Sequence, residues 1–230
     1  MKKSLLLMMF LFLLTSPAHA GLKEGKEAYK NKNWFQAILN LRPLAKTGNA
    51  EAMVLLGNMY NDGNGVKKDP AIAFKHYQQA ATLKNSNAML AVGAMYLNSS
   101  VVKKDFTKGI EWITKSANHD NQDAQFFLGF MYLKGLKKPE LEITEDKEKS
   151  YFWFKLASQH RPMKKQEQAY KLMAQKVAEE SLTPEQVQKL DTDLKSWISK
   201  NSRLHPDYKD PTNSLTKPKT EITPELSKSN

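Results

Sequence analysis

Serine and lysine residues three positions apart are the first feature of this sequence that could do chemistry. Two such pairs occur, Ser100–Lys103 and Ser214–Lys217, and Lys46–Gly48 has the sequence Lys-Thr-Gly. Enzymes that acylate a serine with a β-lactam use these patterns, with the serine at a helix start, the lysine one turn later, and Lys-Thr-Gly afterwards on a strand. Here Ser100 is expected in a loop and Ser214 in a polar tail, and Lys46 precedes both. We therefore predict that the matches are accidental.

Two histidines, His119 and His160, are expected at equivalent places, each at the C-terminal end of a helix. A cation there interacts with the negative end of the helix dipole, which contributes about 0.3–1 kcal/mol. No His, Asp or Glu residues recur at a spacing typical of metal ligands, so we expect no metal and no cofactor. Gly63-Asn64-Gly65 precedes a helix but follows no strand, which argues against a phosphate-binding loop. These features indicate a protein without catalytic residues.

The elements that would position any site are three copies of one pattern, with a period of 36 residues. Its members are Ala52, Ala88 and Ala124; Gly57, Gly93 and Gly129; and Tyr60, Tyr96 and Tyr132. Each tyrosine precedes a turn, and a second helical stretch follows over Asp69–Leu83, Asp105–His119 or Asp146–Ser158. Such a period predicts a solenoid. Glycine within a helix costs about 1 kcal/mol relative to alanine, so its recurrence predicts a close approach of a neighbouring helix.

Turn and cap signals place the remaining elements. Asp69-Pro70 puts aspartate at an N-cap and proline at the first helical position. The third repeat is five residues longer than the others, and the extra residues within Lys137–Thr144 are expected to form a loop. The predicted order is a half-repeat over 21–49, repeats over 50–85, 86–121 and 122–160, capping helices over 161–201 and a disordered tail over 202–230. The last capping helix is predicted to start at a capping box on Thr183.

The N-terminus has the features of a secretory signal peptide. Lys2 and Lys3 precede the apolar run Leu5–Leu14, and Ala18-His19-Ala20 is a small-x-small cleavage site before Gly21. Ten apolar residues fall short of the roughly 20 that span a bilayer, so we expect no transmembrane segment after cleavage. The chain contains no cysteine. The prediction is a periplasmic or secreted bacterial protein whose residues 1–20 are removed.

The charge of the chain is strongly positive. The formal net charge is +11, and removal of Lys2 and Lys3 would leave +9. A basic protein of the cell envelope is expected to favour anionic partners, such as phosphorylated glycolipids, cell-wall polymer or acidic proteins. Nucleic acid is not expected as a partner, because the sequence has no motif that enters a groove of a duplex.

The repeat pattern resembles the Sel1-like repeat, a relative of the tetratricopeptide repeat. The first copy matches at Ala52, Leu56-Gly57, Tyr60, Gly63, Gly65-Val66, Asp69, Ala73 and Ala80-Ala81. The second copy lacks the loop glycines, and in the third the loop is displaced. The resemblance implies an all-α fold, a right-handed α-solenoid of helix pairs with a C-terminal capping helix. It also implies a scaffold or adaptor for protein complexes, since members of this family mostly have that role.

By similarity to tetratricopeptide grooves, one side of the first helix of each repeat should face a concave surface. The predicted partner-binding residues on that side are Asn58, Asn61, Asn87, Leu90, Leu97, Asp123, Phe126 and Phe130. Exposed aromatic residues there would bind a partner helix or strand. The alternative is that the apolar members, Leu90, Leu97 and Phe126 among them, pack between adjacent helices. For Phe130, whose equivalents are Asn58 and Ala94, both interpretations stay open.

A second candidate surface is a row of lysines before the second helix of each repeat. Its members are Lys67, Lys68, Lys103, Lys104, Lys137 and Lys138. A solenoid would place these loops along one edge, which would form a basic ridge. The alternative is that these are ordinary solvated charges, partly offset by Asp69 and Asp105.

The sequence thus leads to three functional hypotheses. The first is a non-catalytic scaffold of the bacterial cell envelope that binds a peptide or protein segment in the concave groove. The second is a basic edge that binds an anionic envelope polymer or lipid. The third is a β-lactam hydrolase, which the order of the motifs disfavours.

Overall fold

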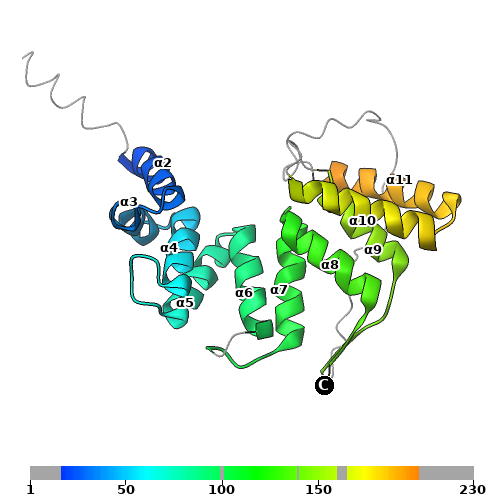
Figure 1. Cartoon of the computed structure of the whole chain (residues 1–230), viewed down its shortest axis with the longest axis horizontal. Helices are drawn as coiled ribbons and strands as arrows, with labels where there is room; N and C mark the ends of the chain where they lie inside the picture. The colour runs from blue at the N-terminus through cyan, green and yellow to red at the C-terminus, as the bar shows by residue number, and fades with distance from the viewer. Residues whose placement is uncertain (1–16, 99–100, 139, 160–164, 202–230) are drawn as a thin grey trace, which may run out of the picture.

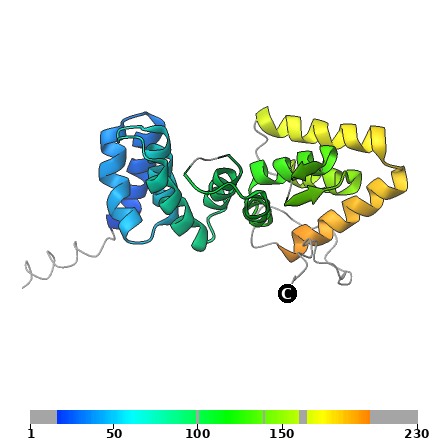
Figure 2. The ribbon, with the colours of Figure 1, turned by 90° about the horizontal axis from the view of Figure 1, so that it is seen from below.

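The computed structural model describes residues 17–98, 101–138, 140–159 and 165–201, with backbone alone at 17–20 and 165–167. Within these ranges the chain forms ten helices and one short hairpin, arranged as an arch with successive helices side by side (Figure 1). Seen from below, α6 and α7 connect the two thicker ends of the arch (Figure 2). The predicted all-α solenoid is confirmed. None of the helices in the described ranges is long and apolar enough to cross a bilayer.

The helices of the described ranges divide into three groups along the chain. Two helices, α2 (Pro17–Lys30) and α3 (Trp34–Lys46), precede the repeats. The repeats are the helix pairs α4 (Ala50–Asp62) with α5 (Pro70–Thr82), α6 (Ser86–Asn98) with α7 (Phe106–Asn118), and α8 (Gln122–Lys134) with α9 (Lys147–Ala157). The chain then forms α10 (Lys165–Ser181) and α11 (Pro184–Lys200).

The recurring glycines lie where the two helices of a repeat touch, as predicted. A Cβ built on Gly57 would lie 2.6 Å from the Tyr77 ring, and one on Gly129 would lie 2.6 Å from the Phe154 ring. At Gly93 the obstacle includes backbone, because a Cβ would lie 2.8 Å from the carbonyl oxygen of Gly109. A side chain at Gly57 or Gly129 would require the facing ring to shift, and one at Gly93 would require the neighbouring helix to move.

The recurring tyrosines and aspartates are joined through the backbone. In each repeat the aspartate N–H donates to the tyrosine carbonyl across the turn. The pairs are Asp69 to Tyr60 at 2.8 Å, Asp105 to Tyr96 at 3.0 Å and Asp146 to Tyr132 at 2.8 Å. The same aspartates cap the second helices, and the Asp69 carboxylate accepts from the N–H groups of Ala71 and Ile72. One residue type therefore closes the turn and starts the helix.

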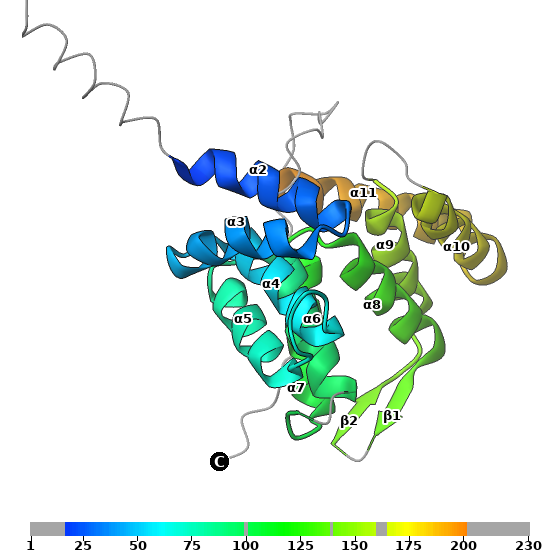
Figure 3. The same ribbon diagram turned by 60° about the vertical axis from the view of Figure 1, so that its left-hand side comes forward.

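The extra residues of the third repeat form a β-hairpin instead of the expected loop. Strands β1 (Leu136–Lys138) and β2 (Leu141–Ile143) pair antiparallel, with Leu136 opposite Ile143. The hairpin extends below α7 and α8 (Figure 3) and reaches the start of α7, where the Thr107 hydroxyl donates to the carbonyl of Glu140 at 3.2 Å. A repeat template of helices alone does not contain this element.

The C-terminal helices both pack on α9. From α10, Ala174 and Val177 are buried with Phe154. From α11, Asp191 accepts from the Tyr151 hydroxyl at 2.8 Å. The predicted capping box at the start of α11 is present, since Gln186 N–H donates to the Thr183 hydroxyl and Thr183 N–H donates to the Gln186 side chain. The last helix pair therefore does not repeat the packing of the earlier ones.

Candidate partner-binding surface

The apolar residues predicted to contact a partner mostly pack between helices. Leu97 is only 8% exposed and lies against Gly109, and Leu90 is half-buried against the same core. Phe126 contacts the ring of Phe154 at 5.2 Å and that of Tyr170 at 4.6 Å between centroids. These three residues have the packing that the alternative expects, and their role as partner contacts stays a prediction.

The position of α10 explains why Phe126 is covered. A helix that follows the second helix of a repeat takes the place of the next first helix, and Phe126 faces that place. Tyr170 of α10 covers the Phe126 ring, and its hydroxyl donates to the Asp123 carboxylate at 2.8 Å. The signal was available in the sequence, because Tyr170 belongs to a predicted helix directly after the third repeat.

The polar residues predicted for this surface have neighbours within the molecule. Asn58 accepts from the Tyr77 hydroxyl at 2.7 Å, and burial raises the pKa of Tyr77, so that hydroxyl stays a donor. Asn87 accepts from the buried Asn121 at 2.7 Å. Asn61 donates to the Asp62 carboxylate at 2.9 Å. Asn87 and Asp123 nevertheless stay exposed, and Asn58 and Asn61 partly so.

Phe130 is the predicted aromatic residue that the helices leave open. It follows Phe126 by one turn on α8, yet 47% of its surface is exposed. Its equivalent in the second repeat, Ala94, is also exposed. We use the term first-helix face for the surface formed by Phe130, Ala94, Asn58, Asn61 and Asn87.

The lysine row is partly assembled around one aromatic ring. The Nζ atoms of Lys104 and Lys138 lie 5.8 and 4.9 Å from the centroid of the Phe106 ring, at cation–π distance. The hairpin thus brings the second and third lysine pairs together. Sequence analysis missed Phe106, although an aromatic residue directly after the N-cap Asp105 was visible.

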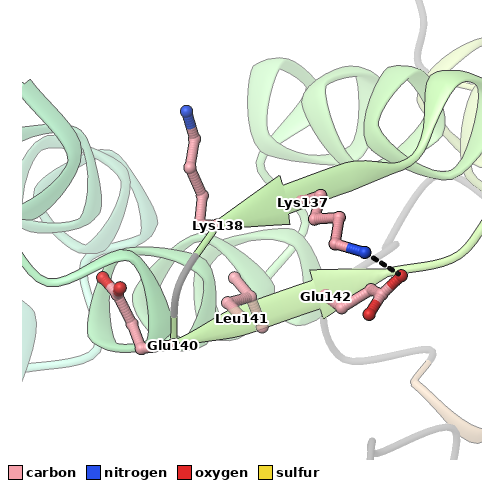
Figure 4. Close-up of a pocket in the computed structure, with 5 residues that line it drawn as sticks. All are labelled: Lys137, Lys138, Glu140, Leu141 and Glu142. Atoms are coloured by element: carbon pink, nitrogen blue, oxygen red, sulfur yellow. Dashed lines mark ion pairs between the residues drawn. The ribbon is translucent and has the colours of Figure 1, made fainter.

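Acidic residues of the hairpin offset part of this positive charge. Lys137 pairs with Glu142 at 3.9 Å beside a shallow hollow that Glu140 and Leu141 also line (Figure 4). The first pair, Lys67 and Lys68, is exposed in its own turn. The structure therefore favours two separate basic patches over one continuous basic ridge.

The residues considered for catalysis lie at helix ends or outside the described residues. His119 ends α7, and its Nδ1 lies 3.0 Å from the carbonyl of Lys115, as expected for a helix end. Lys46 is the last residue of α3, so Lys46–Gly48 is not on a strand. Ser100, Ser214 and His160 lie outside the described residues. Within the described ranges, no three His, Asp or Glu residues are grouped as metal ligands would be.

The chain is similar to one protein family and to several solved structures. The Sel1 repeat family matches residues 50–85, 86–121 and 122–161. A solved Sel1 repeat protein from Oxalobacter formigenes has a TM-score of 0.53 at 22% identity, covering 66% of this chain and 68% of that one. A protective antigen of uropathogenic Escherichia coli with an SLR fold has a TM-score of 0.44 at 20% identity. That comparison covers 81% of this chain and 46% of the antigen.

No curated protein matches the sequence. Sel1 repeat proteins are generally scaffolds for protein interactions and generally non-catalytic. The 36-residue period, the helix pairs closed by tyrosine and aspartate, and the three matched segments lead to one conclusion. The chain belongs to the Sel1 repeat family.

Proposed function

We propose that this protein is a non-catalytic scaffold of the bacterial cell envelope that binds a peptide or protein segment on the first-helix face. The proposal rests on Phe130, whose side chain is 47% exposed, although the ring of Phe126, one helical turn before it, is covered. Exposed aromatic residues are frequent hot spots of protein interfaces, and the polar residues Asn58, Asn61 and Asn87 are predicted to lie on the same side of the earlier first helices. The export signal predicted for residues 1–20 supports the envelope location.

The contacts expected from this face are of two kinds. The Phe130 ring would insert between apolar side chains of the partner, and the asparagine side chains would bond to its backbone or polar groups. Asn58 and Asn87 each have an amide group with further donor and acceptor capacity, because an asparagine side chain makes up to four hydrogen bonds. Asp123, fixed by Tyr170, adds a negative charge at the edge of the face.

The test is capture from an envelope extract on the immobilised protein, with Phe130→Glu compared to the wild type. The matched control is Leu172→Glu, because Leu172 is also a large exposed apolar residue, 64% exposed on α10. We expect Phe130→Glu to lose a protein that the wild type and the control both retain at high salt. Equal retention by all three would contradict the proposed face.

A second candidate function rests on the lysines around Phe106. Lys104 and Lys138 approach one ring from two different repeats and would present two ammonium groups to an anionic envelope polymer or lipid. Binding of this kind should fall steeply with salt, because exposed charges are screened. Neutralising Lys103, Lys104 and Lys138 with glutamine should abolish it, and unchanged binding would exclude this surface.

A further inference from the structure

Helix α3 carries an exposed stripe that the repeat packing does not use. Its members are Phe35, Leu39, Arg42 and Lys46, at intervals of four, three and four residues. At 100° per residue these positions fall within about 60° of one another on the helix surface. Phe35 is 69% exposed and Leu39 is 52% exposed, while Arg42 and Lys46 are also exposed. We call these four residues the α3 stripe.

The opposite side of α3 explains why the stripe is not core. Ala37, Leu41, Leu44 and Ala45 are buried against the neighbouring helices. Trp34 and Ile38 pack beside them on the shared core. An amphipathic helix buries one apolar side, and in α3 the buried residues named above form that side. Phe35 and Leu39 are therefore extra apolar residues, and they are two of the most exposed large apolar side chains in the described ranges.

The charge around the stripe is of one sign. Residues 31–50 contain Lys32, Arg42 and Lys46 and no acidic residue. The nearest acids on α2, Glu24 and Glu27, line a polar hollow with Gln36 and Asn40, on another side of α3 from the stripe. Any partner of the stripe would therefore meet two apolar side chains bordered by cations.

The adjacent turn adds further positive charge at this end of the molecule. Gly65, with φ +70°, packs directly against Trp34, which fixes the turn of the first repeat on α3. The exposed Lys67 and Lys68 follow that turn by two and three residues. The basic character of the stripe therefore continues onto the first repeat.

The shape of this region favours a flat partner. Helix α3 lies on the outer side of the arch at its N-terminal end (Figures 1 and 3). Phe35 and Leu39 are not among the residues that line the hollow between α2 and α3. An exposed Phe and Leu with flanking Lys and Arg is the composition of helices that lie in a membrane interface.

We propose that the α3 stripe docks on a lipid surface containing anionic headgroups. Phe35 and Leu39 would enter the boundary between headgroups and acyl chains, and Arg42, Lys46 and Lys32 would bind lipid phosphates. Docking through α3 leaves the first-helix face, carried by α4, α6 and α8, available to a protein partner. This inference does not depend on the proposed function, and either can fail alone.

The test uses sedimentation with vesicles of phosphatidylcholine, with and without phosphatidylglycerol. The protein is expressed from the full sequence, including its own N-terminal segment, and is purified in the form that the cell produces. All variants are prepared in the same way. Arg42→Gln with Lys46→Gln should weaken binding to anionic vesicles about thirtyfold, because each cation near such a surface contributes about 1 kcal/mol. Phe35→Ser with Leu39→Ser should weaken it about tenfold through loss of apolar insertion.

Matched controls use exposed residues at the other end of the molecule. Lys189→Gln with Lys195→Gln on α11 removes the same charge, and Leu172→Ser on α10 removes an exposed apolar side chain. Both should bind as the wild type does. Far-UV circular dichroism and the melting temperature should be unchanged in every variant, because all the substituted side chains are exposed.

A depth measurement separates insertion from simple charge attraction. The emission of Phe35→Trp should shift to the blue on anionic vesicles and be quenched by brominated lipid, whereas Leu172→Trp should do neither. Absence of wild-type binding, equal binding to neutral vesicles, or α3 variants that bind like the controls would overturn the proposal. Stripe variants that keep lipid binding but lose a captured protein would instead assign the stripe to a protein partner.

Discussion

Replacement of Gly93 by alanine tests whether the recurring glycines are required by helix packing. A Cβ at this position would lie 2.8 Å from the carbonyl oxygen of Gly109, 2.7 Å from Ile113 Cγ1 and 3.1 Å from Ile113 N. Two of these three atoms are backbone, so rotation of a side chain cannot relieve the clash. Helices α6 and α7 would have to move apart, which opens the core next to Ile113, only 1% exposed.

The expected magnitude combines two opposing effects. Alanine gains about 1 kcal/mol over glycine in a helix interior. Overpacking of a core costs about 1–3 kcal/mol, and the upper end applies when backbone is the obstacle. We therefore expect Gly93→Ala to lower the free energy of unfolding by about 2 kcal/mol. The assay is urea unfolding followed by circular dichroism at 222 nm, a wavelength that reports helix content.

The adjacent exposed Ala94 supplies the control. Ala94→Gly measures the helix propensity difference in the same turn without a packing change, and should cost about 1 kcal/mol. A stabilised or unchanged Gly93→Ala protein, in the presence of a destabilised Ala94→Gly protein, would refute the close-packing explanation. It would mean that α6 and α7 separate without cost.

Three further predictions concern single side chains. Asp105→Ala should cost about 1 kcal/mol in urea unfolding, because the carboxylate caps α7, whereas Asp105→Asn should be nearly neutral. Tyr170→Phe should cost about 1 kcal/mol by loss of the hydroxyl bond to Asp123, and no cost would mean that water replaces it. Burial lowers the pKa of His76, whose ring stacks on Tyr60 and whose Nδ1 has no hydrogen-bond partner among the described residues. Its neutral form is therefore favoured in the folded state, so stability should fall as the pH drops below about 6.5, and thermal melts of His76→Phe should show a smaller fall.

The repeat core could be predicted from the sequence because its determinants are local and periodic. Gly57 recurs at a fixed spacing and Asp69 recurs at the start of each second helix, and each acts within its own helix pair, so the pattern alone indicates their roles. The end of the array could be predicted only in part. The Thr183 capping box is a local signal, but the burial of Phe126 depends on where α10 packs, and that is a long-range contact.

The repeat pattern alone does not predict the hairpin or the arrangement of the lysine row. The spacing of Asp105 and Asp146 predicts the insertion, yet its strands have no counterpart in the described residues of the other two repeats. Alternation of Leu136, Lys137 and Lys138 is too short to indicate a strand by itself. The contact of Lys138 with Phe106 follows from the direction in which the hairpin folds, which no residue spacing specifies.

The backbone bond from Asp146 to Tyr132 has a consequence for the segment between them. This bond, 2.8 Å long, holds the two ends of the insertion together in the same way as the shorter turns of the other repeats. The number of residues between the two ends therefore does not determine the register of α8 against α9. Loops whose ends are tied in this way accept foreign sequence. A sequence grafted into this segment is accordingly expected to leave the register of α8 and α9 unchanged, at the cost of the contacts that Glu140 and Lys138 make with the start of α7.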